Sequence, residues 1–228
     1  MYPLVAICFH LGYNNRFNEF TPYIDNVLQI CPNADLYITY REDPDPSNMC
    51  LSKYPRAKFF KSVRGCDIGA FLRQIQAMIH SQKTYDYVFK LHTKSNNSVA
   101  TNWIQELLDK IAGSPENVKR ILRMFKHHKS IGLIGSERWV LKREISFRYF
   151  YNICKKGRIN IDGHFIGGTI FWIRFPILKI VFSPPRFNID FEYPLFELGK
   201  PSEPSYTHAW ERVLGLMVET EGYRIKGV

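Results

Sequence analysis

The stretch that decides the fold runs Lys61-Ser-Val-Arg-Gly-Cys-Asp-Ile-Gly-Ala-Phe71 and continues, through a helical pattern, into Tyr85-Asp-Tyr-Val-Phe-Lys-Leu-His-Thr-Lys94. Its two ends are typical of β-strands, and a glycine turn separates the first of them from apolar residues that recur at helical spacing. A helix with one apolar face must pack on a sheet, so the stretch predicts a strand, a helix and a second strand. The apolar face consists of Ile68, Phe71, Leu72, Ile75, Met78 and Ile79.

The segments upstream continue the same alternation. Residues 3–10 form a short apolar run rich in β-forming residues, which is typical of a buried strand in a parallel sheet. Residues 17–31 have one apolar face at helical spacing, residues 34–40 alternate as a strand, and residues 58–63 form the strand that enters the stretch above. This order favours right-handed crossovers and a mostly parallel sheet.

The downstream half is less regular. Two helices are predicted within 103–125 and a fifth strand over 130–135. In residues 162–174, several glycines precede a run of β-forming residues. Residues 184–204 lack a regular pattern, and the last helix is predicted over about 208–219. We therefore expect an α/β fold with a mostly parallel central sheet flanked by helices.

The composition fits a single domain with an anionic partner. The 228 residues are 45% hydrophobic and 15% aromatic, which is enough for one sizeable core. The formal net charge of +10 indicates nucleic acid, a membrane surface or a phosphorylated small molecule, and charge alone does not choose among them.

The sequence predicts neither a disulfide framework nor a membrane segment. The five cysteines are odd in number and scattered, without a Cys-x-x-Cys pair, which is typical of reduced thiols. The N-terminus lacks the basic region and the long apolar run of a signal peptide, and no stretch reaches membrane-spanning length. We therefore expect a soluble protein of the cytoplasm with no transmembrane segment.

Polar residues follow the predicted strands, and in a parallel sheet such positions meet along one edge. A diphosphate requires cations or N–H donors, a glycine where the backbone comes close, and often a divalent metal with oxygen or imidazole ligands. These polar positions supply all three kinds of group, so we predict that they converge on a diphosphate. They are residues 10–14, 64–67, 92–96, 162–169 and 208–212.

Four blocks of the sequence follow one another in a characteristic order. They are Arg64-Gly-Cys-Asp-Ile-Gly-Ala-Phe71, Tyr85-Asp-Tyr-Val-Phe-Lys-Leu-His-Thr-Lys94, Phe165-Ile-Gly-Gly-Thr-Ile-Phe-Trp-Ile-Arg174 and Thr207-His-Ala-Trp-Glu-Arg212. Together they resemble the rhamnan synthesis F family over roughly residues 1–215, and four ordered blocks are far more specific than one. Members of that family are glycosyltransferase-like domains of polysaccharide assembly, with relatives encoded by large algal viruses.

The resemblance implies a single Rossmann-like domain of the GT-A type over residues 1–228, with a nucleotide-binding part at about 1–100 and an acceptor-side part at about 101–228. It also implies transfer of a sugar, with rhamnose as the specific case, from a UDP- or dTDP-sugar to a hydroxyl of a glycan or glycoprotein acceptor. For a viral member, the location would be the host cytoplasm. The residues expected to bind the donor are His10, Tyr13, Arg64, Gly65, Asp67, His92, Thr93, Lys94, Gly168 and Thr169.

The metal-binding motif of this fold family is absent at the end of the fourth strand. Most GT-A enzymes place Asp-x-Asp there, where the carboxylates bridge Mn²⁺ or Mg²⁺ to the diphosphate, whereas this chain has Lys90-Leu-His-Thr-Lys94. Two alternatives stay open. Either His92 and His208 help to hold a divalent cation, or Lys94 and Arg64 neutralise the diphosphate without one.

A transfer that inverts the sugar needs a side chain to take the proton of the acceptor hydroxyl. Glu211, at the start of a helix, and Asp162, before a glycine turn, are the candidates, with Glu211 preferred. A retaining transfer stays open as well.

Two functions of other classes stay open beside the transferase. The missing carboxylates suggest a non-catalytic nucleotide- or glycan-binding module derived from a transferase. The positive charge suggests a nucleic-acid-binding protein, but the sequence has no recognised nucleic-acid motif, so nucleic acid is not an expected partner. The basic residues within 119–129 are interpreted as a solvated helix face, with peripheral membrane contact as the alternative.

Overall fold

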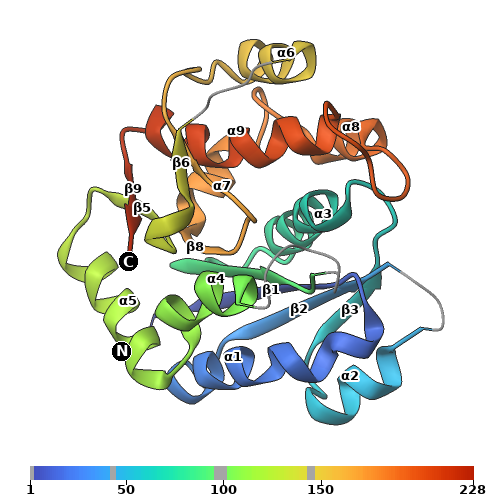
Figure 1. Cartoon of the computed structure of the whole chain (residues 1–228), viewed down its shortest axis with the longest axis vertical. Coiled ribbons are helices and arrows are strands. Elements are labelled where there is room, and N and C mark those ends of the chain that lie inside the picture. The colour runs from blue at the N-terminus through green and yellow to red at the C-terminus, as the bar shows by residue number, and fades with distance from the viewer. Residues whose placement is uncertain (1–2, 42–44, 95–101, 143–146) are drawn as a thin grey trace.

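The computed structural model describes residues 3–41, 45–94, 102–142 and 147–228. Within these residues, seven strands form one sheet in the order β3-β2-β1-β4-β8-β5-β9, and β6 and β7 form a separate antiparallel pair (Figure 1). The strands are β1 (Val5–Leu11), β2 (Asp35–Tyr40), β3 (Lys58–Lys61), β4 (Tyr87–His92), β5 (Ile131–Gly135), β6 (Val140–Lys142), β7 (His164–Ile166), β8 (Phe171–Arg174) and β9 (Arg224–Gly227).

Helices cover both faces of the sheet (Figure 1). One hydrophobic core lies between the sheet and α1, α4 and α5, and a second lies between the sheet and α3, α6, α7 and α9. Every residue of β1 is buried because the strand is covered on both sides, as its continuous apolar run predicts. The longer helices are α1 (Phe17–Ile30), α3 (Cys66–His80), α4 (Trp103–Ala112), α5 (Pro115–His127), α6 (Arg148–Gly157) and α9 (Tyr206–Thr220), and the shorter ones are α2 (Ser47–Lys53), α7 (Phe175–Val181) and α8 (Ile189–Glu192).

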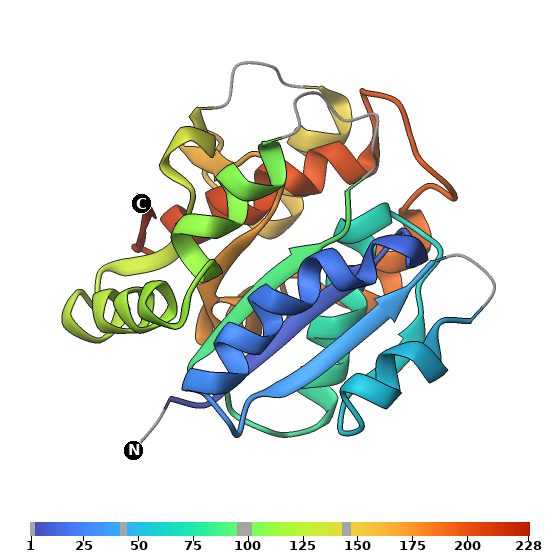
Figure 2. The ribbon, with the colours of Figure 1, turned by 60° about the horizontal axis from the view of Figure 1, so that its bottom comes forward.

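The predicted strand–helix–strand unit is present as β3, α3 and β4. β1 pairs in parallel with both β2 and β4, and β2 pairs in parallel with β3 (Figure 2). The chain runs outward from β1 through β2 to β3 and then returns to the other side of β1 as β4. The connections that leave β1 and β4 therefore lead to opposite edges of the sheet. In open α/β sheets, ligands bind beside the carboxyl ends of the two strands at such a point.

The run predicted over 162–174 forms two strands rather than one. A turn at Gly168 and Thr169 separates β7 from β8, and both residues have positive φ angles, of 75° and 52°. β8 then runs antiparallel to β4 and to β5 inside the main sheet. The expected mostly parallel sheet flanked by helices is therefore confirmed, with β8 as its antiparallel member.

Other boundaries differ from the predictions for local reasons. The segment 184–204, predicted to be irregular, contains α8 and the 3-10 helix η3 (Tyr193–Leu195), and α8 begins after Asn188, whose side chain accepts from the Asp190 N–H. α9 begins earlier than predicted because the Ser205 side chain caps it, accepting from the N–H of His208. The edge strand β9 was not predicted.

All five cysteines are free, in agreement with the expectation of thiols. In the part of the chain that the structure describes, no helix combines the length and apolar character needed to cross a bilayer. The division into nucleotide-binding and acceptor-side parts near residue 100 stays a prediction.

Candidate functional site

A pocket of about 330 Å³ lies at the carboxyl ends of β1 and β4. His92 ends β4, His10 is the next-to-last residue of β1, and the two are direct neighbours in the strand register. The first turn of α3 and the start of α9 complete the walls. Of the residues predicted from the sequence, the pocket brings together His10, Tyr13, Asp67, His92, Thr93, Lys94, Gly168, Thr169, His208 and Glu211.

The N-terminus of α3 reaches the pocket through a tight glycine turn. Gly65 has a φ angle of 67°, and a Cβ atom there would lie 2.5 Å from the Phe196 ring, so this position requires glycine. The helix has no side-chain cap at Gly65, and Cys66 and Asp67 of its first turn line the pocket. The partial positive charge of the helix end therefore faces the space where a ligand would lie.

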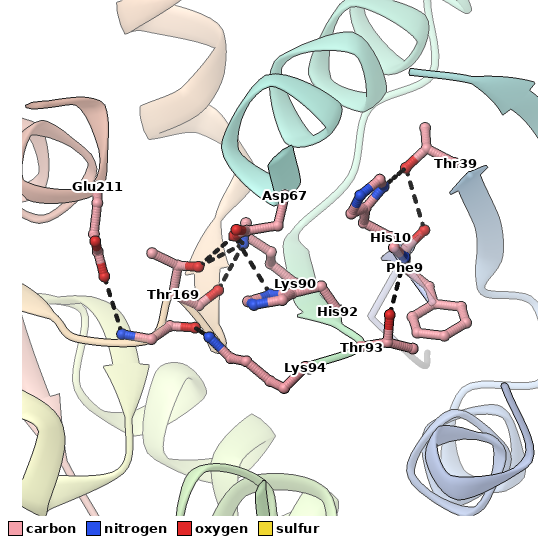
Figure 3. A network of polar contacts seen from close by, with 12 residues as sticks. Phe9, His10, Thr39, Asp67, Lys90, His92, Thr93, Lys94, Thr169 and Glu211 are labelled. Carbon is pink, nitrogen blue, oxygen red and sulfur yellow. Dashed lines mark hydrogen bonds and ion pairs between the residues drawn. The ribbon is translucent and has the colours of Figure 1, made fainter. Parts of the chain in front are cut away.

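A buried lysine holds the Asp67 carboxylate (Figure 3). Lys90 Nζ lies 2.8 Å from Asp67 Oδ2, 2.7 Å from the Thr169 carbonyl oxygen and 2.9 Å from Thr169 Oγ1. Burial lowers the pKa of Lys90, and the charge of Asp67 acts against this shift, while three acceptors satisfy all three N–H groups of an ammonium. Thr169 Oγ1 in turn donates to Asp67 Oδ2 at 2.6 Å. Burial alone would raise the pKa of Asp67, but neighbouring cations hold this pKa well below its usual value.

Lys94 and Glu211 both bind the backbone of Gly168 (Figure 3). Lys94 Nζ donates to the Gly168 carbonyl oxygen at 3.0 Å, and the Gly168 N–H donates to Glu211 Oε1 at 3.1 Å. Burial lowers the pKa of Lys94 to about 8, although the negative charges of Asp67 and Glu211 act to raise it. Burial raises the pKa of Glu211, and the nearby negative charge of Asp67 adds to this shift. The pocket therefore places an amine and a carboxyl group on two sides of the Gly168 turn.

The two strand-end histidines are neutral at neutral pH. Burial lowers the pKa of His10 to about 4 and lowers the pKa of His92 well below its usual value. His10 Nδ1 lies 3.1 Å from Thr39 Oγ1. His92 Nδ1 lies 3.4 Å from Asp67 Oδ2 without a hydrogen bond, and because the imidazole is neutral this contact is not an ion pair.

The Thr93 hydroxyl is engaged by backbone N–H groups, so its role is to hold the backbone around the pocket. Its Oγ1 accepts from the N–H groups of Gly12 and Tyr13, at 2.9 Å and 3.0 Å. These hydrogen bonds join the loop after β1 to the end of β4, at the carboxyl ends of the two strands.

Three predicted site residues lie outside this pocket. The Arg64 guanidinium donates to the carbonyl oxygen of Phe196 at 2.9 Å, so the expectation that Arg64 faces a diphosphate is not supported. Gly65 is buried behind the pocket wall, where it provides the turn rather than a contact. Asp162 is exposed and does not line the pocket, so the predicted convergence of 162–169 holds only for its last two residues.

Sequence reasoning missed several residues that line the pocket or support it. A lysine inside a buried apolar strand needs a counter-charge, so the position of Lys90 indicated an acidic partner, which the structure shows to be Asp67. Arg41 lies just beyond the end of β2, a strand-end position like those that were predicted. Trp103 and Lys200 also line the pocket, but neither follows a predicted strand, so their sequence positions did not indicate the site.

The pocket offers an incomplete set of metal ligands. Among the described residues, no three histidine, cysteine, aspartate or glutamate side chains are grouped so that they could hold a metal ion. His92 and His208 do line the same pocket, and the neutral imidazole of His92 is the form that binds metals. A cation held there would therefore have to take its other ligands from a bound diphosphate and water.

The comparisons with known proteins agree with this geometry. The family model described as "Rhamnan synthesis protein F" matches residues 3–223. The chain belongs to this family. Among curated proteins, none matches this family member.

Several solved structures resemble this chain in fold. A mannosyltransferase from Pyrobaculum calidifontis, in complex with GDP-Man and Mn²⁺, has a TM-score of 0.50 at 13% identity, over 100% of this chain and 55% of that chain. Glucosyl-3-phosphoglycerate synthase from Mycobacterium tuberculosis has a TM-score of 0.44 at 11% identity, over 85% and 63% of the two chains. A cytidylyltransferase from Leptospira borgpetersenii has a TM-score of 0.45 at 9% identity, over 100% and 76%.

At such identities the similarity concerns the fold alone. The Rossmann-like GT-A architecture is confirmed by the fold, and the expected membership of the rhamnan synthesis F family is confirmed by the family model. This chain spans 55% of the mannosyltransferase and 63% of the synthase, so it represents only part of their lengths.

Proposed function

We propose that this protein transfers a sugar, with rhamnose as the specific case, from a UDP- or dTDP-sugar to a hydroxyl group of a glycan or glycoprotein acceptor. The observation that carries the proposal is the pocket at the carboxyl ends of β1 and β4. It combines a helix N-terminus and the Lys94 amine, which suit a diphosphate, with the carboxyl group of Glu211, which suits a proton transfer. The reaction would take place in the cytoplasm.

Glu211 is the proposed base. Its carboxyl group lines the pocket, and the Gly168 N–H fixes one of its oxygens at 3.1 Å. Burial raises its pKa toward neutrality, which makes the carboxylate a stronger proton acceptor at the pH of the cell. It would take the proton of the acceptor hydroxyl as the hydroxyl oxygen attacks the anomeric carbon. Asp162 has no part in this proposal because it lies outside the pocket.

The leaving diphosphate needs positive charge near its oxygens. A divalent cation, such as the Mn²⁺ of the mannosyltransferase complex, would supply this charge, and His92 and His208 would hold it. On the protein side, the first turn of α3 and Lys94 would bind and orient the same group. Lys94 already donates to the Gly168 carbonyl, so its position relative to Glu211 is fixed.

The test is to incubate the chain with UDP- and dTDP-linked sugars, with Mn²⁺ present, and to follow the release of nucleoside diphosphate. We expect release from at least one donor, to water or to an added glycan. A chain that bound UDP or dTDP but released neither from any donor would be a non-catalytic module. A chain that neither bound nor released them would contradict the proposal.

A further inference from the structure

We infer that this pocket neutralises the donor diphosphate with three cationic side chains of its own, Arg41, Lys94 and Lys200, so that a nucleoside diphosphate binds without a divalent cation. The inference rests on the proposed function and assigns phosphate contacts to Arg41 and Lys200, neither of which was predicted from the sequence. A cation at His92 and His208 would add to this charge but would not be required for binding.

The three cations come from three separate parts of the chain. Arg41 follows β2, Lys94 follows β4, and Lys200 lies between η3 and α9. All three line the same pocket. Arg41 is close enough to exert an electrostatic effect on His10 and Cys66, and Lys200 acts on Cys66 as well, so both positive charges act on the pocket wall.

The acidic side chains of the pocket do not cancel these charges. Asp67 is already paired with Lys90 beneath the pocket floor. Glu211 is the other carboxylate among the described lining residues, and it accepts from the Gly168 N–H. Within the described parts of the chain, neither Arg41 nor Lys200 has a recorded ion pair or hydrogen bond. Among the described lining residues, positive charges therefore outnumber negative ones.

This excess matches the ligand of the proposed function. Each phosphate of a nucleotide sugar carries a negative charge. An anion that lies between neighbouring cations offsets the repulsion among them. The N-terminus of α3 adds N–H groups at the same wall. By contrast, the carboxylate that could best attract a metal, Asp67, has its Oδ2 atom engaged by Lys90 and Thr169. Cationic side chains would thus take the role that carboxylates and a metal fill in most GT-A enzymes.

The test is calorimetric titration of the full chain with UDP and with dTDP, first after removal of metals with EDTA and then with Mn²⁺. We expect saturable binding in EDTA, and each of Arg41→Gln and Lys200→Gln should weaken it about tenfold, as expected for loss of a charged hydrogen bond. Arg224→Gln and Lys226→Gln are matched controls, because both residues are exposed on β9 at the edge of the sheet and outside the pocket. The controls should leave the affinity unchanged.

The outcomes separate this inference from the proposed function. Binding that appears only with Mn²⁺ would overturn the inference and leave the transferase proposal intact. Binding in EDTA that survives both Arg41→Gln and Lys200→Gln unchanged would overturn the assignment of these residues. Absence of binding under both conditions would contradict the proposed function and the inference together.

Discussion

Lys90 Nζ lies 2.8 Å from Asp67 Oδ2, and this contact joins the centre of the sheet to the first turn of α3 directly beneath the pocket. The Lys90 side chain is 2% exposed, so water cannot take the place of its partner. The same amine holds Thr169, whose positive φ angle is unusual for a residue with a β-branched side chain. The pair therefore fixes α3 and the Gly168 turn relative to each other.

Replacing one member of this pair should destabilise the fold strongly. We expect Lys90→Met to lower the free energy of unfolding by about 2 to 3 kcal/mol, because Asp67, whose side chain is 19% exposed, loses its hydrogen-bonded partner. Denaturant unfolding followed by circular dichroism measures this loss. The double variant Lys90→Met with Asp67→Asn should recover a large part of it, since no buried charge is then unpaired. A single variant as stable as the wild type would show that the pair is not a structural requirement.

Removing the Glu211 carboxylate should stop transfer without preventing donor binding. Glu211→Gln keeps an oxygen that can accept from the Gly168 N–H but cannot take a proton. We expect turnover to fall by about 10²- to 10⁴-fold, with the affinity for nucleoside diphosphate within a few-fold of the wild type. The matched control is Glu219→Gln on the same helix, whose side chain contacts His164 outside the pocket. Equal turnover in the Glu211→Gln protein would remove Glu211 as the base.

The Glu197 carboxylate should contribute pH-dependent stability through α9. Its Oε1 accepts from the Tyr206 N–H at 2.6 Å, and its Oε2 accepts from Thr207 Oγ1 at 2.9 Å. Burial acts to raise the pKa of Glu197, but these hydrogen bonds outweigh it and lower the pKa below the usual 4.5. A carboxyl group whose pKa is lowered by folding stabilises the fold above its unfolded-state pKa and loses this effect as pH falls through the folded-state value.

We therefore expect Glu197→Gln to cost about 1 kcal/mol at pH 7, a modest amount because solvent screens this partly buried group. The difference between variant and wild type should shrink as the pH falls below about 4.5. Unfolding curves measured from pH 3 to pH 7 test this. A difference that stayed constant across this range would mean that the charge of Glu197 is not what stabilises α9.

The glycine before α3 should tolerate no side chain. Gly65→Ala must adopt a φ angle of 67° and also place a Cβ atom 2.5 Å from the Phe196 ring. We expect a loss of about 2 kcal/mol or more in the free energy of unfolding. Gly199→Ala is the matched control, because Gly199 has a φ angle of 76° with no atom within 4 Å of the added Cβ. If both variants lost the same amount, the contact with Phe196 would play no part.

The sequence pattern was a good guide to the first half of the chain. The apolar runs and the helical spacing around residues 61–94 predicted β3, α3 and β4, since burial on both faces of a parallel sheet leaves a clear periodic signal. The direction of β8 was not predictable, because alternation says nothing about whether a strand pairs in parallel or antiparallel. The turn at Gly168 and Thr169, which reverses the chain, depends on contacts with Lys90 and Lys94 from a distant strand.

The sequence predicted where the site lies better than it predicted which side chains make contacts there. Strand-end residues such as His10, His92 and Lys94 converge because the sheet topology requires it. Arg64 also follows a strand, but its guanidinium binds the carbonyl oxygen of Phe196, in a segment predicted to be irregular. Tertiary contacts of this kind decide which way a long side chain points, and they are not encoded in local spacing.

The most direct test is a crystal structure of the chain with UDP or dTDP bound. We predict that the nucleotide lies at the carboxyl ends of β1 and β4, with its diphosphate within hydrogen-bond distance of Lys94 and with Glu211 on the side where the sugar would extend. A nucleotide bound elsewhere, or with its diphosphate turned away from Lys94 and from the start of α3, would contradict this prediction.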